Sequence, residues 1–527
     1  KPWTWLHAIK DYTDMAAHLE TVPGARAVVN FSPVLIEQLQ DYPRRIRGRL
    51  DGDEAIGDFV LDALAGRFPE QNAALTAQLL RVNEQRMMPR FRPYAELFDR
   101  AAAALNGDRA LSDEAFHDLL VWYVLVWLGE SLRGSDLIEA MVAQGRHFQF
   151  DDRRKLLAHV ADVMDAILPR YRELARSGAV ELSVTPYAHP ILPLLLDYES
   201  AREAMPGVQL PENIDSDGKA RCNWHLDEAR CAFLEVFGSE PPGCWPSEGA
   251  VSEATLRVLA RHHFRWAASG SAVLATSLGD TSESPPGPAH LHAWQLDDGP
   301  SPACFFRDDG LSDLIGFEYS RWQADDAVAD FLGHLERLRS DALTAGNTAP
   351  VLSIIMDGEN AWEYFDHNGW DFLQGLYAAL AEHPGLRLAT FSDVVERCEP
   401  RMLPRLRAGS WVHGNFSTWI GEPAKNLAWS LIADAGREVE HSPRSKDPAV
   451  LRQLAICEAS DWMWWLGESV TLQDAPAFDA LFRHQLAELY RMIGSTPPAT
   501  LDEPLCRHAT GSGPSDDIVG AMRRSTG

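Results

Sequence analysis

The sequence predicts an α/β protein: a parallel sheet closed as a barrel, with a large helical insertion and a C-terminal helical domain. Between Gly24 and Pro400, short apolar runs pass repeatedly into segments of helical periodicity, the alternation that builds a parallel sheet. Between residues 51 and about 178 this alternation stops, and Ala, Leu, Arg and Glu recur at helical spacing. The 527 residues accommodate one α/β domain of roughly 250 to 400 residues and an accessory domain.

The elements follow in order along the chain. Residues 1–20 predict a first helix, and GARAVVNFSPVLIEQL from Gly24 predicts a strand that passes into a helix. LLVWYVLVWLG from Leu119 is shorter than a membrane span of about 20 residues and predicts a buried helix. Further strands are expected from residues 179, 264, 303, 352 and 387, and further helices from 225, 327 and 370.

After Pro400 the pattern changes. GSWVHGNFSTWIGEPAKNLAW from Gly409 is a Gly-punctuated, Trp-rich stretch that precedes helices running to about residue 493. We therefore expect a catalytic barrel domain over 1–400, a C-terminal helical domain over 401–495 whose aromatic loop faces the barrel mouth, and an irregular tail over 496–527.

Charge and cysteine content limit the partners and the compartment. A formal charge of −28, with no Lys/Arg run to offset it, argues against nucleic acid and membrane surfaces as partners. The seven cysteines are scattered, which fits a reducing compartment and predicts a cytoplasmic protein. The chain starts at Lys1 rather than Met, so we expect a leading segment to precede it. Nothing in the sequence specifies an oligomeric state.

Two carboxylates are candidates for catalysis. Glu248 lies in GCWPSEG between a tryptophan and a turn, and Asp357 ends the apolar run LSIIMD. Strands of α/β barrels deliver active-site residues at their carboxyl ends, and burial there would raise the pKa of Asp357, as a general acid requires. One ionised and one protonated carboxyl are what glycosidic bond cleavage needs. The alternative for each is a helix N-cap.

The remaining candidates would bind the substrate. The 17 Trp residues suit stacking on sugar rings, although any one of them can equally fill the core. Arg307 and Asp309 could orient hydroxyls or form an internal ion pair, and His189 and His413 could bind a sugar or stabilise their own loops. The other candidates are Trp245, Glu359, Trp362, Trp411 and Trp419.

Other chemistries lack a signature. The sequence has no P-loop and no GxGxxG, GxSxG or HExxH motif. His and Asp do not recur at ligand spacing, so we expect neither a metal nor another cofactor.

Four stretches together resemble glycoside hydrolase family 57, and within it the α-amylase and amylopullulanase-like branch. They are AVELSVTPYAHPILPLL, GCWPSEG, IIMDGENAWEYF and GSWVHGNFSTWIG, in the order of four of the family's five motifs. The resemblance implies a (β/α)7 barrel with a C-terminal helical domain and retaining chemistry at α-glucosidic bonds. It implies that Glu248 is the nucleophile and Asp357 the acid/base, and that Glu181 and His189 belong to the second motif.

One motif of the family is not in the sequence. The family's opening His-Gln-Pro segment lies on the first strand, and this sequence begins where that strand should have ended. We expect the segment to precede Lys1; without it the barrel would be open at one seam and would lose a substrate-binding histidine.

The first hypothesis is therefore a retaining hydrolase that acts on an α-glucan or malto-oligosaccharide. A 4-α-glucanotransferase or glucan branching enzyme would share the first half-reaction and differ in whether water or a sugar hydroxyl reaches the intermediate. A catalytically silent α-glucan-binding protein and a metal-dependent carbohydrate enzyme, such as a deacetylase or mannosidase, are hypotheses of other classes.

Overall fold

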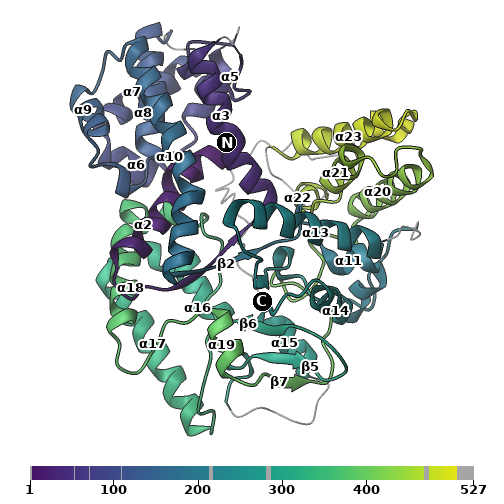
Figure 1. Ribbon diagram of the computed structural model, residues 1–527. Coiled ribbons are helices and arrows are strands. Elements are labelled where there is room, and N and C mark those ends of the chain that lie inside the picture. Colours follow the sequence, from purple (N-terminus) through teal and green to yellow (C-terminus); the bar gives the residue numbers. More distant parts are fainter. Residues whose placement is uncertain are drawn as a thin grey trace.

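The computed structural model describes residues 3–52, 54–69, 72–107, 110–212, 218–279, 287–467 and 474–506. Figure 1 shows a lower part built from the sheet and its helices, a helical cluster at the upper left formed by the first third of the chain, and C-terminal helices at the upper right. The C-terminal stretch from residue 507, which belongs to the predicted tail, lies outside the described residues.

One seven-stranded sheet organises the molecule, with strand order β1-β2-β3-β4-β6-β5-β7. All neighbouring strands pair in parallel, except that β5 and β6 pair with each other in antiparallel fashion. The longest ladders pair β1 with β2 and β4 with β6, over five residues each. The predicted α/β class is thereby confirmed. The strands are β1 (Ala27–Phe31), β2 (Val180–Val184), β3 (Gly243–Cys244), β4 (Trp266–Gly270), β5 (Trp294–Leu296), β6 (Ala303–Arg307) and β7 (Arg401–Leu403).

The chain opens with a continuous helical segment, as predicted, but its middle turn is a π-helix. The segment consists of α1 (Trp3–His7), the π-turn η1 (Ala8–Tyr12) and α2 (Thr13–Thr21). The predicted strand and helix from Gly24 are confirmed as β1 and α3. The hydroxyl of Ser32 caps α3 by accepting a hydrogen bond from Leu35 N at 3.2 Å, which is why the helix begins directly after the strand.

Helices fill the described residues between β1 and β2. The predicted buried helix is α8, whose last nine residues are all buried. The long α10 packs against α3 and returns the chain to the sheet. The helices of this region are α3 (Pro33–Asp51), α4 (Phe59–Leu64), α5 (Asn72–Leu79), α6 (Glu84–Arg90), α7 (Arg92–Leu105), α8 (Asp113–Trp127), η2 (Glu130–Leu132), α9 (Asp136–Gln144) and α10 (Phe150–Ser177).

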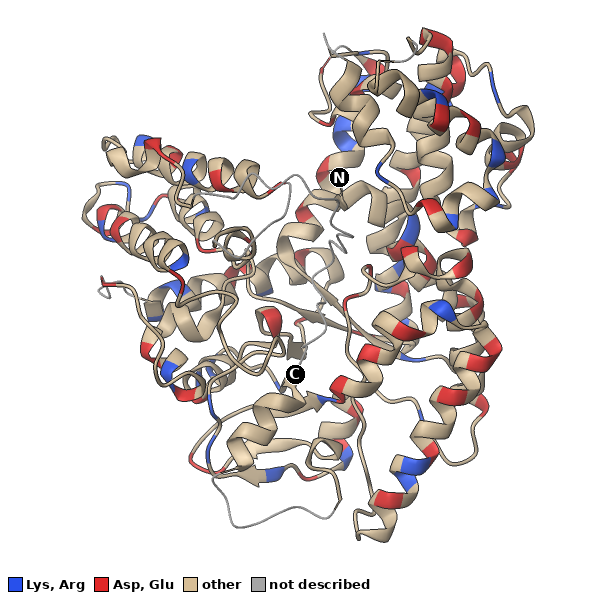
Figure 2. Ribbon diagram, turned by 180° about the vertical axis from the view of Figure 1, so that it is seen from behind, with Lys and Arg blue, Asp and Glu red and all other residues tan. Residues whose placement is uncertain are grey.

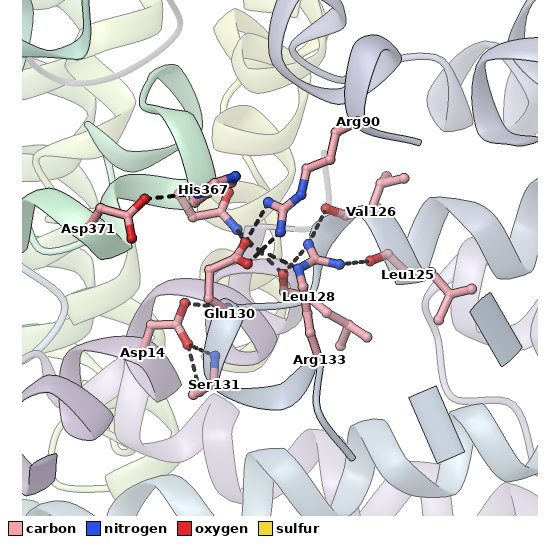
Figure 3. Close-up of polar contacts among 11 residues, drawn as sticks. Asp14, Arg90, Leu125, Val126, Leu128, Glu130, Ser131, Arg133, His367 and Asp371 are labelled. Atoms are coloured by element: carbon pink, nitrogen blue, oxygen red, sulfur yellow. Dashed lines mark hydrogen bonds and ion pairs between the residues drawn. The ribbon is translucent and has the colours of Figure 1, made fainter. Parts of the chain in front are cut away.

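A polar network joins this helical region to the rest of the molecule (Figure 3). The Glu130 carboxylate accepts hydrogen bonds from the Arg90 guanidinium at 2.6 Å and from Arg133 Nε at 3.1 Å. Asn368 lies eleven residues after Asp357, and its Nδ2 donates to the same carboxylate at 3.1 Å. The backbone N–H of Glu130 donates to Asp14 of α2 at 2.7 Å. Glu130 therefore connects three segments that are far apart in sequence.

Helices and short turns connect the strands from β2 to β7 along the chain. The predicted helices from residues 225, 327 and 370 are confirmed as α13, α17 and α18. These elements are α11 (Leu192–Leu196), η3 (Tyr198–Ser200), α12 (Ala201–Ala204), α13 (Gly218–Phe237), η4 (Ser247–Gly249), α14 (Glu253–Arg261), α15 (Ser271–Leu278), η5 (Ala289–Leu291), α16 (Asp309–Asp313), η6 (Leu314–Glu318), η7 (Tyr319–Arg321), α17 (Ala324–Thr344), η8 (Trp362–Tyr364), η9 (Asp366–Gly369), α18 (Trp370–Glu382) and α19 (Phe391–Arg397).

The predicted strand from residue 352 is wrong. Only Ser353 forms a bridge, parallel to Arg307 at the end of β6. Ile355 is engaged by side chains instead: its N–H donates to Ser312 Oγ at 3.3 Å, and its carbonyl accepts from Arg307 Nη1 at 3.1 Å. A ladder cannot continue where side chains occupy these backbone groups.

The strand predicted from residue 387 is also wrong, because 387–390 join no ladder in the described structure. The segment leads instead into the helix α19. The sheet gains β5 and β7, which the sequence analysis did not predict because runs of three residues carry too little periodicity.

The C-terminal region is helical, with α20 (Pro423–His441), α21 (Pro448–Cys457), α22 (Asp461–Trp465), α23 (Ala475–Met492) and η10 (Ala499–Asp502). The division of the chain at residues 400 and 495 stays a prediction. Acidic residues lie on many helices in the view of Figure 2. Within the described residues, no helix combines the length and the apolarity needed to cross a bilayer.

Candidate active site

A cavity of about 1350 Å³ contains the predicted catalytic carboxylates. It is lined by Glu248, which follows β3, and by the loop 357–360 beyond β6. All five residues of β1 also line it. Its volume exceeds the roughly 300 to 1,000 Å³ of most small-molecule sites, so an oligomeric substrate fits its size.

Glu248 lies in a strained turn at the end of β3. Its φ of 57° lies in the left-handed region, which an L-residue adopts only when surrounding contacts hold it there. Ser410 Oγ donates to the Glu248 carbonyl at 2.8 Å, and Ser269 Oγ donates to the next carbonyl, of Gly249, at 2.6 Å. These hydroxyls fix the turn, and the carboxyl group that it carries is buried.

Trp411 binds the Glu248 carboxylate from the Trp-rich C-terminal loop. Its Nε1 donates to Glu248 Oε2 at 3.0 Å, and its ring meets that of Trp245 edge-on at 5.0 Å. Gly270, at the end of β4, permits this approach because a Cβ there would lie 2.9 Å from Trp411 Cα. Trp464 also hydrogen-bonds to Glu248. Two indole groups therefore stabilise the Glu248 carboxylate.

Asp357 lies in the loop that follows the bridge to β6. Asn360 Nδ2 donates to Asp357 Oδ2 at 2.7 Å. Burial raises the pKa of Asp357, although the Asn360 hydrogen bond and the charge of Arg307 oppose the shift. Burial also raises the pKa of Glu359, to about 7, in the same loop.

The carboxyl groups of Glu248 and Asp357 repel each other across the cavity. Burial, followed by the charge of Asp357, raises the pKa of Glu248 to about 8, despite the hydrogen bond from Trp411. Burial raises the pKa of Asp357 as well, and because the pKa of Glu248 lies above 7, the two groups together hold at least one proton at neutral pH. A buried carboxyl pair with a retained proton can combine acid and nucleophile chemistry.

The sequence model of the family described as "Glycosyl hydrolase family 57" matches residues 1–407. The chain belongs to glycosyl hydrolase family 57. A curated relative, the "Putative alpha-amylase" of Methanocaldococcus jannaschii, is 21% identical over 317 residues, which are 57% of this chain and 59% of the relative.

Solved structures of family 57 proteins share the fold. The branching enzyme from Thermococcus kodakaraensis has a TM-score of 0.58 at 16% identity, covering 95% of this chain and 89% of that one. The alpha-amylase AmyC from Thermotoga maritima has a TM-score of 0.55 at 14% identity, covering 94% and 89%. These similarities and the mostly parallel sheet identify a (β/α)7-type barrel with added helical regions, as the resemblance to family 57 implied.

Several predicted substrate-binding residues lie around the family 57 cavity. His189, Trp245, Glu359, Trp362 and Trp411 all line it. The His189 ring contacts Ser460 Oγ through Nδ1 at 2.8 Å, so a serine that precedes α22 helps to hold the ring. Trp362 is mostly buried, and its indole N–H donates to the Gly358 carbonyl at 2.8 Å, so it supports the loop of Asp357.

Arg307 and Asp309 do not line the cavity. They form an internal ion pair, which the sequence analysis gave as the alternative to orienting sugar hydroxyls. Arg307 Nε lies 2.6 Å from Asp309 Oδ1. The guanidinium lies over the Trp411 ring at 4.7 Å, so Arg307 supports that ring from behind.

The structure does not bring three other candidates to the family 57 cavity. Glu181 lies near the amino end of β2, where its carboxylate accepts hydrogen bonds from Trp266 Nε1 at 2.6 Å and from Ser392 N at 3.0 Å. Trp419 is fully buried against Trp464 and packs in the core rather than offering a stacking face. His413 is exposed at a left-handed position of its loop.

The sequence analysis missed residues that other segments bring in. Asp461, at the start of α22, lines the cavity, and its charge acts on both Glu248 and His189. The sequence offered one signal, since Asp461 opens the aromatic run DWMWWLG. Among the described residues, no group of three or more His, Cys, Asp or Glu side chains is placed to hold a metal ion.

Proposed function

We propose that this protein is a retaining glycoside hydrolase, α-amylase- or amylopullulanase-like, that cleaves α-glucosidic bonds in α-glucans. The observation that carries the proposal is the buried, mutually repelling pair Glu248 and Asp357 in one large cavity. Two carboxyl groups flanking the scissile bond are the catalytic machinery of most glycosidases.

In the first step, a Glu248 oxygen bonds to the anomeric carbon as that carbon's bond to the leaving oxygen breaks. Asp357 donates its proton to the departing oxygen, so no free alkoxide forms. In the second step, Asp357 takes a proton from water, the water oxygen bonds to the anomeric carbon, and Glu248 leaves as a carboxylate.

This cycle requires that Glu248 be ionised and Asp357 protonated when the substrate is bound. The indole groups of Trp411 and Trp464 favour the ionised form of Glu248 because they hydrogen-bond to it. Positive charge that develops on the sugar during bond breaking favours that form further. The proton shared by the pair then lies on Asp357.

The names of the relatives support the substrate class. The curated relative is named an alpha-amylase, and the solved relatives are named branching enzymes and an alpha-amylase. Because the match spans 59% of the curated relative, its activity supports the proposal without establishing it. The buried thiols of Cys222, Cys244, Cys304 and Cys457 support a reducing, cytoplasmic compartment.

The test is to incubate the protein with amylose, pullulan and glycogen and to count reducing ends and branch points. Hydrolysis predicts new reducing ends without new branches. Branches or longer chains without matching reducing ends would show transfer instead. Co-sedimentation with glycogen without release of sugar would identify a silent binding protein.

Two variants separate the catalytic roles. Asp357→Ala should lose activity on amylose but still form the glycosyl-enzyme from an α-glycosyl fluoride, because fluoride leaves with little protonation. Glu248→Gln should fail on both substrates because it has no nucleophile. A Glu248→Gln variant that turns over amylose would refute the assignment.

A further inference from the structure

A polar side chain on β1 opens into the cavity. Val29 and Phe31 of this strand are buried, whereas Asn30 between them is exposed. Because successive side chains of a strand point to opposite faces, Asn30 lies on the face opposite to these two core residues. Asn30 lines the cavity that also contains Glu248. The register of the sheet pairs Asn30 with Ser183 of β2.

Three hydrogen bonds connect Asn30 to the neighbouring strands. Asn30 Nδ2 donates to Thr185 Oγ1 at 3.1 Å, and Ser183 Oγ donates to Asn30 Oδ1 at 3.1 Å. The Thr185 hydroxyl donates in turn to the Trp245 carbonyl at 2.8 Å. Ser183 and Thr185 are fully buried. Of the three side chains, only Asn30 therefore has surface that a ligand can reach.

The Trp245 carbonyl fixes the direction of the Asn30 amide. A carbonyl only accepts, so the Thr185 hydroxyl uses its single proton on Trp245. Thr185 Oγ1 can then only accept from Asn30, so the group that faces it is the NH2 group and not the amide oxygen. The amide oxygen faces Ser183, which donates to it. The protein thus orients the amide before any ligand binds.

The oriented amide keeps half of its hydrogen-bonding capacity. A primary amide has two N–H donors and two acceptor lone pairs. Within the part of the chain that the structure describes, Thr185 takes one donor of Asn30 and Ser183 takes one lone pair. The second donor and the second lone pair are available to a ligand in the cavity. Two adjacent hydroxyl groups of a sugar ring match them, because one can accept while the other donates.

Asn30 belongs to the same wall of the cavity as the predicted nucleophile. Trp245, whose carbonyl ends the row of hydrogen bonds, precedes Glu248 by three residues. The Trp245 ring lines the cavity and meets the ring of Trp411, which donates to the Glu248 carboxylate. A sugar held by Asn30 therefore occupies the cavity in which Glu248 would act.

We propose that Asn30 is a substrate-binding residue, which holds one glucosyl unit of the α-glucan through two adjacent hydroxyl groups. Ser183 and Thr185 are positioning residues, because they set the direction of the amide without reaching the ligand. The inference rests on the proposed function, since it takes an α-glucan as the occupant of the cavity. An oriented amide discriminates against a sugar that lacks either hydroxyl, because its own donor or acceptor is then left without a partner.

The first test measures the dissociation constant of maltotriose in the Asp357→Ala protein, in which bound sugar is not consumed. Adding Asn30→Ala should weaken binding about 10-fold, because two hydrogen bonds to the sugar are lost. Asn106→Ala is the matched control, since Asn106 is exposed at the end of α7 and does not line the cavity; it should change the constant less than about twofold. Undiminished binding in Asn30→Ala would overturn the proposal.

A set of maltotrioses that each lack one hydroxyl group separates binding from support of the fold. For two analogues that lack adjacent hydroxyls, the loss caused by Asn30→Ala should shrink to about threefold, since one of the two hydrogen bonds is already absent. For the other analogues it should stay near 10-fold. An equal loss for every analogue would show that Asn30 only supports the strands, and the proposal would fall.

Ser183→Ala tests the orientation of the amide and can be read even if Asn30→Ala is unstable. We expect about threefold weaker binding of maltotriose and less discrimination against the same two analogues, because the Asn30 amide is no longer held on its oxygen side. Combined with Asn30→Ala, it should cause no further loss. Additive losses, or unchanged discrimination, would contradict the positioning role.

These titrations do not depend on turnover, so they separate the two proposals. Binding with the expected pattern, but without release of sugar from amylose by the unmodified protein, would refute hydrolysis and leave the role of Asn30 intact. Hydrolysis of amylose together with an equal loss for every analogue would refute the role of Asn30 alone. An Asp357→Ala protein that binds no maltotriose would also overturn it.

Discussion

Replacing Glu248 by Gln should stabilise the fold at neutral pH while it removes turnover. The unfolded chain ionises Glu248 above its ordinary pKa of 4.5, whereas burial and the charge of Asp357 raise the pKa in the folded chain to about 8. As the pH rises from 4.5 to 8, ionisation therefore favours the unfolded state, and this side chain costs stability progressively. Gln cannot ionise in either state, so the cost disappears.

The magnitude follows from these two pKa values. Each pH unit between them costs about 1.4 kcal/mol, so the interval from 4.5 to 7 amounts to about 3 kcal/mol. The unfolding entropy of about 2.1 cal/mol/K per residue, over 527 residues, is about 1.1 kcal/mol/K. We therefore expect Glu248→Gln to melt about 3 °C above the unmodified protein at pH 7, and at nearly the same temperature below pH 4.

Scanning calorimetry from pH 4 to 8 measures this difference. Glu139→Gln on α9 is the matched control, because Glu139 is exposed and its replacement should change the melting temperature little at any pH. A difference for Glu248→Gln that does not grow with pH, or a variant that melts lower at pH 8, would refute the electrostatics assigned to the pair.

Three further predictions concern the surroundings of the site. Trp411→Phe removes the hydrogen bond to Glu248 and should lower kcat/KM by about 10- to 100-fold. Trp419 does not line the cavity, so Trp419→Phe should change kcat/KM less than about twofold. Equal losses in the two variants would contradict the role of Trp411 in stabilising the Glu248 carboxylate. Gly270→Ala should cause a similar loss by displacing Trp411, while Gly436→Ala in α20, where a Cβ meets nothing within 4 Å, should leave kinetics unchanged. Glu130→Gln should lower the unfolding free energy at pH 7 by about 2 to 4 kcal/mol, since it leaves Arg90 and Arg133 uncompensated. The arginine hydrogen bonds and charges lower the pKa of Glu130 against the effect of burial, so this difference should vanish as the pH falls through that lowered value, and denaturant melts at pH 3 and 7 would show whether it does.

One rule of barrel folds located the predicted catalytic pair: residues that follow the strands meet at one end of the sheet. Asp357 follows the apolar run LSIIM, and Glu248 follows the short strand β3. Applied to Glu181, the same rule would have argued against a site role, since Glu181 is the second residue of β2, at the amino end, and does not line the cavity. Only the resemblance to a family motif suggested that it binds substrate. Position along a strand was therefore the better guide.

What the sequence could not predict is set by contacts between distant segments. The aromatic content of the C-terminal loop predicted sugar stacking equally for Trp411 and Trp419, yet one lines the cavity and the other fills the core. Which of the two occurs depends on the packing of α22, since Trp464 covers Trp419. In the same way, the helical periodicity of residues 1–20 does not reveal that one turn is a π-helix.

The placement of the cations explains how the site holds a proton at neutral pH. Three carboxyl groups, on Glu248, Asp357 and Glu359, line one cavity, and burial raises the pKa of each. An arginine or lysine beside these carboxyl groups would pair with them and lower those pKa values, which would leave no acid. Arg26 and Arg339 line the same cavity, but Arg26 pairs with Asp393 and Arg339 with Glu336, and Arg307, outside the lining, pairs with Asp309. We therefore expect that a lysine introduced into the cavity wall, for example at Thr185, would move the alkaline limb of kcat/KM to lower pH and reduce the rate at pH 7.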